Sequence, residues 1–326
     1  MSLFLFLAFW SVACGGRSRV HAVLPTADLL EAGWSALQDQ DPEAALEAFS
    51  PVADRENAAD SERAQALFGL GVASSELGDH REALMHFEHL VEKYSDQPDL
   101  VFRALLREAN EYNKLQRFDR AEAVLLRALE TAGDDSEASG DSRVMGNPFA
   151  NRRHYAAFAL AEYYYERHRP VLALVYAAAT QHPFPYVHFC GNAQRTETFR
   201  EVLLESKILG DLHRETEALG VLIPHLFKTD SNSNLDKELS IRASWLMKQQ
   251  FSSEELQAKI EESLNSLRKT DSGPWEVILM SQSVLFSPYS LTEDRIEVDP
   301  SLETVRGYLS ETSFFRELRG KATFVE

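Results

Sequence analysis

An internal repeat of 38 residues constrains the fold of this chain more than any other feature. A small residue followed four positions later by a large apolar one occurs three times, with the small residue at Ala45, Ala83 and Ala121. Each copy contains two stretches with apolar residues at i, i+3, i+4 and i+7, separated by a polar turn, which predicts a pair of amphipathic helices. Such a unit buries its apolar face only against a neighbour, so we expect an all-α solenoid.

The residues at the packing positions resemble those of the tetratricopeptide repeat (TPR) family. The second unit matches best, with Leu70-Gly71, Gly78-Asp79, Ala83 and Phe87. The period exceeds the usual one of about 34, and this lengthened form is similar to TPR outer-membrane lipoproteins of the BamD/YfiO type and to periplasmic proteins of the YbgF type. The resemblance implies repeat-packing roles for Gly33, Ala45, Phe49, Leu70, Gly71, Ala83, Phe87, Tyr112, Ala121, Leu125, Leu160, Ala161 and Ala173.

Residues 26–130 hold the three TPR-like units, and the remainder of the chain is less regular. Residues 131–148 predict an acidic loop because turn formers and acids dominate there. Residues 149–271 are expected to form degenerate TPR-like helix pairs. Residues 272–326 predict a C-terminal capping region, in which the apolar runs 275–280 and 283–286 fit a helix or two strands equally. Residues 300–319 predict a helix that either caps the solenoid or docks a partner.

The N-terminus predicts export from the cytoplasm. Residues 2–13 are apolar, shorter than the roughly 20 residues that span a bilayer as a helix, and fit a signal peptide over 1–13 followed by a tether over 14–25. Ser11-Val12-Ala13-Cys14 resembles the lipobox of bacterial lipoproteins, which implies a lipid anchor on Cys14 and a place in the cell envelope, at the outer membrane facing the periplasm. An ordinary cleaved signal and a buried N-terminal segment are the alternatives.

Charge and cysteine content exclude several classes of function. The chain has 51 acidic and 33 basic residues, a net charge of -18, whereas nucleic-acid binding requires clustered Lys and Arg. Its two cysteines are too few for a disulfide scaffold or a Cys-based zinc site. Nucleotide-binding glycine loops and hydrolase motifs do not occur in the sequence. We therefore expect no nucleic-acid partner, no cofactor, no metal and no enzymatic activity.

Three short patterns suggest chemistry only weakly. His86 and His89 lie three apart on a predicted helix, but a third metal ligand is not apparent, which favours surface histidines. The segment 230–236 begins like a calcium loop yet has Leu235 and Ile241 where Gly and Glu are required. Cys190 has no neighbouring motif of a nucleophile and predicts a buried structural thiol.

The TPR resemblance also implies where a partner would bind. In that family the second, fifth, ninth and twelfth positions of each first helix face the ligand on the concave side, and this spacing puts them on one stripe. In this chain the stripe supplies aromatic, amide and charged side chains for proteins or extended peptides: Trp34, Phe68, Arg103, Leu106, Asn110, Asn113, Tyr155, Phe158, Glu162 and Tyr165.

The sequence therefore predicts a membrane-tethered scaffold or adaptor that binds protein partners in a bacterial envelope. Two other functions are open at this point: a lipoprotein that binds a small ligand or a glycan, and the helical scaffold of a cell-wall enzyme.

Overall fold

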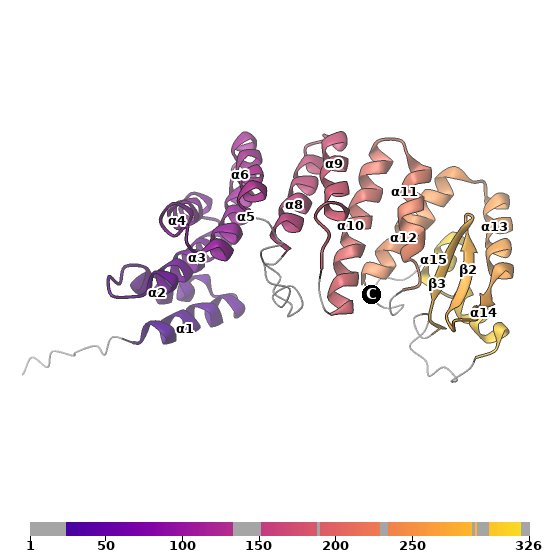
Figure 1. The fold of residues 1–326 in the computed structure, drawn as a ribbon, viewed down its shortest axis with the longest axis horizontal. Coiled ribbons are helices and arrows are strands. Elements are labelled where there is room, and N and C mark those ends of the chain that lie inside the picture. The colour runs from indigo at the N-terminus through magenta and orange to yellow at the C-terminus, as the bar shows by residue number, and fades with distance from the viewer. Residues whose placement is uncertain are drawn as a thin grey trace, which may run out of the picture.

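The computed structural model describes residues 24–132, 151–187, 190–228, 234–288, 291 and 300–320. These residues form one long row of helix pairs with a small sheet at its C-terminal end (Figure 1). The predicted signal peptide, Cys14, most of the acidic loop and the start of the calcium-loop-like segment lie outside the described residues.

The row is built from six consecutive helix pairs. The bounds are α1 (Thr26–Gln38) and α2 (Pro42–Ala53); α3 (Asp60–Glu76) and α4 (His80–Lys93); α5 (Pro98–Lys114) and α6 (Phe118–Thr131); α8 (Arg152–Glu166) and α9 (Pro170–Gln181); α10 (Gly191–Asp211) and α11 (Glu215–Leu222); α12 (Asn234–Gln250) and α13 (Ser253–Ser266). Each first helix contacts the first helix of the next pair, so α1, α3, α5, α8, α10 and α12 form one continuous layer. We call it the first-helix layer.

The turn inside a pair has the same geometry in the first five pairs. Each contains one residue with positive φ, namely Gln40, Gly78, Gln116, His168 or His213. The next residue donates its backbone N–H to the carbonyl five positions earlier, at 2.9 Å from Asp79 to Ser74 and again at 2.9 Å from Arg214 to Leu209. This is the Schellman arrangement, which satisfies the last carbonyls of a helix. The solenoid thus continues through pairs whose sequence periodicity is weak.

In the first two pairs the helices pack closely because an aromatic ring of the second helix fills a notch left by glycine. A Cβ atom on Gly33 or on Gly69 would come within 2.5 Å of the Phe49 ring, and one on Gly71 within 2.4 Å of the Phe87 ring. Real Cβ atoms do not approach that closely, so these positions accept no side chain without a shift of the ring. Phe49 and Phe87 are completely buried.

Two hydrophobic cores meet in α10. The first core begins at Leu30 and includes Leu204 and Ile208. The second includes Phe199 and Leu209 and continues to the C-terminal helices. Because both cores use α10, this helix joins the regular N-terminal units to the C-terminal part of the molecule.

The C-terminal region contains a sheet as well as helices. Strands β1 (Arg268–Lys269), β2 (Trp275–Leu279) and β3 (Gln282–Phe286) are antiparallel in the order β1-β2-β3, with Val277 opposite Val284. The two apolar runs are therefore strands. The sheet contacts α13 and a short 3₁₀ helix at Ile223–His225. A two-residue turn at Met280 and Ser281, both with positive φ, lets the chain reverse between β2 and β3.

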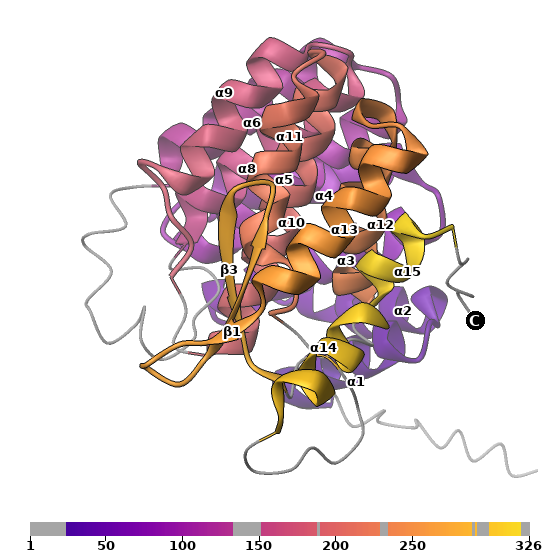
Figure 2. The ribbon, with the colours of Figure 1, turned by 90° about the vertical axis from the view of Figure 1, so that its right-hand side faces the viewer.

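The segment predicted as one helix over 300–319 forms two. These are α14 (Leu302–Ser310) and α15 (Ser313–Leu318), and α15 lies on α12 at the end of the row (Figure 2). Phe314 and Phe315 are completely buried, and Ser244 of α12 donates to the Phe314 carbonyl at 3.1 Å. The fold is an all-α TPR-like solenoid with a less regular C-terminal part, as the sequence predicts. Among the described residues, no helix is long and apolar enough to cross a membrane.

The glycine notch makes a direct prediction. Gly71→Ala places a methyl group against the buried Phe87 ring, and overpacking of this kind costs about 1–3 kcal/mol, more than the helix preference of alanine returns. Gly191→Ala is the matched control, because nothing lies within 4 Å of a Cβ atom there. Urea unfolding followed by circular dichroism measures both. A Gly71→Ala variant as stable as the wild type would contradict the role of the notch.

Candidate partner-binding groove

Four of the residues predicted to contact a partner line a single hollow between α5 and α8. Leu106, Asn110 and Asn113 come from α5 and Glu162 from α8. The hollow has a volume of about 280 Å³, and its other lining residues are Ala109, Leu125, Ala159, Tyr163 and Glu166. The stripe therefore converges at this pair of helices.

Helical spacing and small side chains produce the hollow. Positions 106, 110 and 113 follow one another at four and three residues, which aligns them on one side of α5. Ala109 of α5 and Ala159 of α8 also line the hollow, and their short side chains leave space that larger residues would fill.

The polar groups of the hollow are available for a ligand. Asn110 is exposed, and Asn113 is half-buried. The buried Oδ1 atom of Asn113 has no hydrogen-bond donor among the residues that the structure describes. An amide side chain offers a donor and an acceptor together, which matches the backbone of an extended peptide.

Glu162 lines the hollow from α8 and is an exposed residue. Loss of hydration nevertheless raises the pKa of its carboxyl group above the ordinary 4.5, and the neighbouring Arg200 offsets that effect only in part. A donor or a cation from a partner would meet an acceptor here that is poorly hydrated.

The structure corrects the prediction for Phe68 and Phe158, which are only 2% and 5% exposed. The guanidinium carbon of Arg103 lies 4.3 Å from the centre of the Phe68 ring, and that of Arg200 lies 4.9 Å from the centre of the Phe158 ring. These rings fill the space between neighbouring first helices. At these two places the stripe presents an arginine to solvent instead of an aromatic ring.

The other aromatic positions are half-buried and take part in packing. Trp34 lies 5.0 Å from Phe49 between ring centres, in an edge-on contact. Tyr155 meets Tyr186 edge-on at 5.9 Å. Burial raises the pKa of Tyr165. None of these three lines the hollow between α5 and α8.

The positions assigned to repeat packing are all buried. Cys190, by contrast, is partly exposed at the N-cap of α10, and hydrogen bonds from the Ala193 and Asn192 backbone lower the pKa of its thiol. The prediction of a buried thiol is therefore wrong, because sequence does not show that a helix begins there. His86 is half-buried and His89 exposed. The described residues contain no group of three or more His, Cys, Asp or Glu arranged to hold a metal.

Sequence reasoning missed a buried polar cluster that joins α3, α4 and α5. Glu111 is completely buried and accepts hydrogen bonds from Ser75 Oγ at 2.7 Å and from Lys114 Nζ at 2.9 Å. Its second oxygen lies 2.7 Å from His80 Nδ1. Burial alone would raise the pKa of Glu111, but the hydrogen bonds from Lys114, Ser75 and His80 hold it below 4.5. Ser75, His80 and Glu111 are 5 to 36 residues apart, so repeat periodicity alone does not indicate the cluster.

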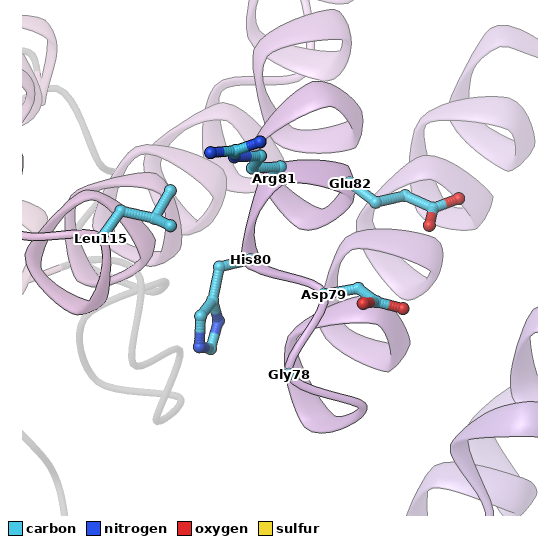
Figure 3. A pocket seen from close by; sticks show the side chains of 6 residues that line it. All are labelled: Gly78, Asp79, His80, Arg81, Glu82 and Leu115. Atoms are coloured by element: carbon cyan, nitrogen blue, oxygen red, sulfur yellow. The ribbon is translucent and has the colours of Figure 1, made fainter.

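A second hollow, of about 450 Å³, lies next to this cluster. Figure 3 shows its lining residues Gly78, Asp79, His80, Arg81, Glu82 and Leu115. The Asp79 and Glu82 carboxylates point away from His80, whose ring is already bonded to Glu111. The side chains of this hollow do not converge on a common point, so we assign the cluster a structural role.

The fold and the groove define a class, the all-α solenoid of TPR-like helix pairs. The tetratricopeptide repeat model matches residues 102–135, so the chain contains such a repeat at α5 and α6, one wall of the hollow. No curated protein matches the chain. Among solved structures, the TPR2AB domain of yeast Sti1 in complex with pHSP90 is similar at 14% identity, covering 72% of this chain and 87% of that chain, with a TM-score of 0.29.

The Glu111 cluster predicts a specific pH dependence of stability. Its folded pKa is below the ordinary 4.5, so its stabilisation is present above that value and is lost as pH falls through the folded pKa. Glu111→Gln should cost about 1–3 kcal/mol at neutral pH, because it weakens buried hydrogen bonds to Lys114 and His80. It should also flatten the fall in Tm below pH of about 4.5. Glu130→Gln, an exposed carboxylate on α6, is the control. An unchanged acid limb in Glu111→Gln would contradict this assignment.

Proposed function

We propose that this protein is a scaffold that holds an extended segment of a partner protein along the first-helix layer, in the hollow between α5 and α8. The TPR match and the repeat architecture support a protein-interaction scaffold. The observation that carries the specific site is the convergence of Leu106, Asn110, Asn113 and Glu162, with the Asn113 Oδ1 atom left without a donor in the described part of the chain.

The shape of the hollow favours a peptide over a small ligand. Sites for small ligands enclose most of the molecule in about 300–1,000 Å³. This hollow, at about 280 Å³, is at the lower end of that range, and it lies on a layer that continues into neighbouring helices. A peptide gains contacts along such a layer, whereas a sugar or a metabolite would stay largely exposed.

The lining also favours binding over chemistry. It includes no Ser, Cys or His that could act as a nucleophile or as an imidazole base. A cell-wall enzyme would have to use Glu162 and Glu166. Both belong to α8 and lie one helical turn apart, whereas a glycosidase places two carboxyl groups on either side of the scissile bond.

A lipid anchor at Cys14 completes the proposed function. It would hold the scaffold at a bacterial membrane, at the outer membrane facing the periplasm, with the binding face free to meet envelope proteins. The support is the sequence alone: the apolar stretch 2–13 and the lipobox-like Ser11–Cys14.

The partner-binding proposal is tested by site-specific photo-crosslinking in cells. A photoreactive residue in place of Asn110 should yield discrete adducts with a partner protein, and Asn113→Ala together with Glu162→Ala should abolish them. The control replaces Val175, an exposed position on α9, which is the second helix of its pair. Adducts that are equally strong from Val175, or that persist in the double variant, would show that the hollow is not the site.

The anchor is tested separately. Intact-mass analysis of the protein from native membranes should show a chain that begins at Cys14 and carries added acyl mass. Cys14→Ser should move the protein from the membrane fraction to the soluble fraction, whereas Cys190→Ser should not. A membrane-bound Cys14→Ser variant or an unmodified chain beginning at Met1 would refute the anchor and leave the groove proposal in place.

A further inference from the structure

The repeat register, extended by the structure, adds two helices to the binding stripe. The small buried position of the first helix, Ala161 in α8, recurs as Ser206 in α10 and Ser244 in α12. The N-caps of α11 and α13, Arg214 and Ser252, are 38 positions apart, which is the period of the N-terminal units. In this register α10 contributes Arg200, Leu203, Lys207 and Gly210 to the stripe, and α12 contributes Glu238, Ile241, Trp245 and Lys248.

On α12 the stripe exposes a large apolar surface. Ile241 and Trp245 lie one helical turn apart and are 39% and 48% exposed. Arg242 lies with its guanidinium carbon 4.9 Å from the centre of the Trp245 ring, and it also donates to the Ser206 carbonyl of α10 at 2.9 Å. This bridge fixes the tryptophan beside α10. A rigid aromatic side chain held next to cationic neighbours is the type of residue that dominates binding energy in protein interfaces.

The stripe positions of α10 and α12 carry more cations than acids, in a chain of net charge -18. The cations are Arg200, Lys207 and Lys248, and the acid is Glu238. Asp211 of α10 also interacts electrostatically with Arg242. Arg200 is paired in part, because Glu197 lies 3.2 Å from its Nη1 atom, while Lys207 and Lys248 are exposed. An acidic segment would be repelled by most of the surface and attracted to this stripe.

We propose that Ile241, Trp245, Lys207 and Lys248 form a second docking surface, on α10 and α12, for an extended acidic segment of a partner protein that carries large apolar side chains. This inference rests on the proposed function because it uses the same first-helix layer. The docking surface itself lies beyond the hollow between α5 and α8. Carboxylates of the segment pair with the two lysines and Arg200, and an apolar side chain packs on the Trp245 ring. Every second side chain of an extended segment points to the same side, so the side that faces α10 and α12 has to carry both acids and a large apolar residue.

The test uses the full chain and a fluorescein-labelled peptide of about twelve residues, enough to extend roughly 40 Å, in which every second position is in turn Asp, Phe, Glu or Leu and the positions between them are Ser. Fluorescence anisotropy should show saturable binding that weakens with salt. Trp245→Ala and the pair Lys207→Glu with Lys248→Glu should each weaken it at least about tenfold, the loss expected of a hot-spot residue. Leu302→Ala, an exposed leucine on α14, and Lys93→Glu, an exposed lysine on α4, should leave the affinity unchanged.

Several results would overturn this inference. The first is equal binding of a peptide that has Lys and Arg in place of the acids, and the second is unchanged binding to Trp245→Ala. The third is no binding at protein concentrations up to about 1 mM, because a dissociation constant above that value corresponds to a very weak interaction. Concentration-dependent dimers that Trp245→Ala dissolves would assign the patch to a second copy. A tenfold gain in peptide affinity on truncation after Gly320 would assign it to residues 321–326. If the peptide does not bind while photo-crosslinks at Asn110 persist, this surface fails and the proposed function stands.

Discussion

The N-terminal part of the solenoid depends on the contact between an aromatic ring and a glycine on the neighbouring helix. Phe49 lies between Gly33 of its own pair and Gly69 of the next, so a single ring sets the distance within a unit and between units. Phe87 repeats the contact with Gly71. Because the rings occupy the notch completely, the two helices of a pair have one close packing arrangement, and the arrangement of the first-helix layer follows from it.

The same packing decides which side chains remain for binding. The stripe rings Phe68 and Phe158 pack between first helices. An arginine from the first helix of the next pair covers each of them. Where α5 meets α8, small residues replace large ones and a hollow with amide and carboxyl groups opens. The proposed binding site in the hollow therefore lies where the packing of this layer is incomplete.

The last helix pair of the row has no further pair to pack against, and other elements cover it. The last pair, α12 and α13, is covered by α15, α14 and a three-stranded sheet rather than by another helix pair. The buried Phe314 and Phe315 complete the second core against α12. On α12 itself Ile241 and Trp245 stay exposed, and Lys248 lines a hollow together with Leu318 and Arg319 at the end of α15.

Sequence alone determined the repeat, because helix pairing is encoded locally by period and by the alternation of small and large residues. It placed Ala83, Gly71 and Phe87 in the core, and it placed Asn110, Asn113 and Glu162 on one face, since helical spacing fixes which residues share a face. Only the tertiary structure decided that Phe68 is buried, that Glu111 gathers Ser75, His80 and Lys114, and that residues 275–286 form strands. Those outcomes depend on which neighbour fills or covers a position, and contacts between residues distant in the chain are not written in local periodicity.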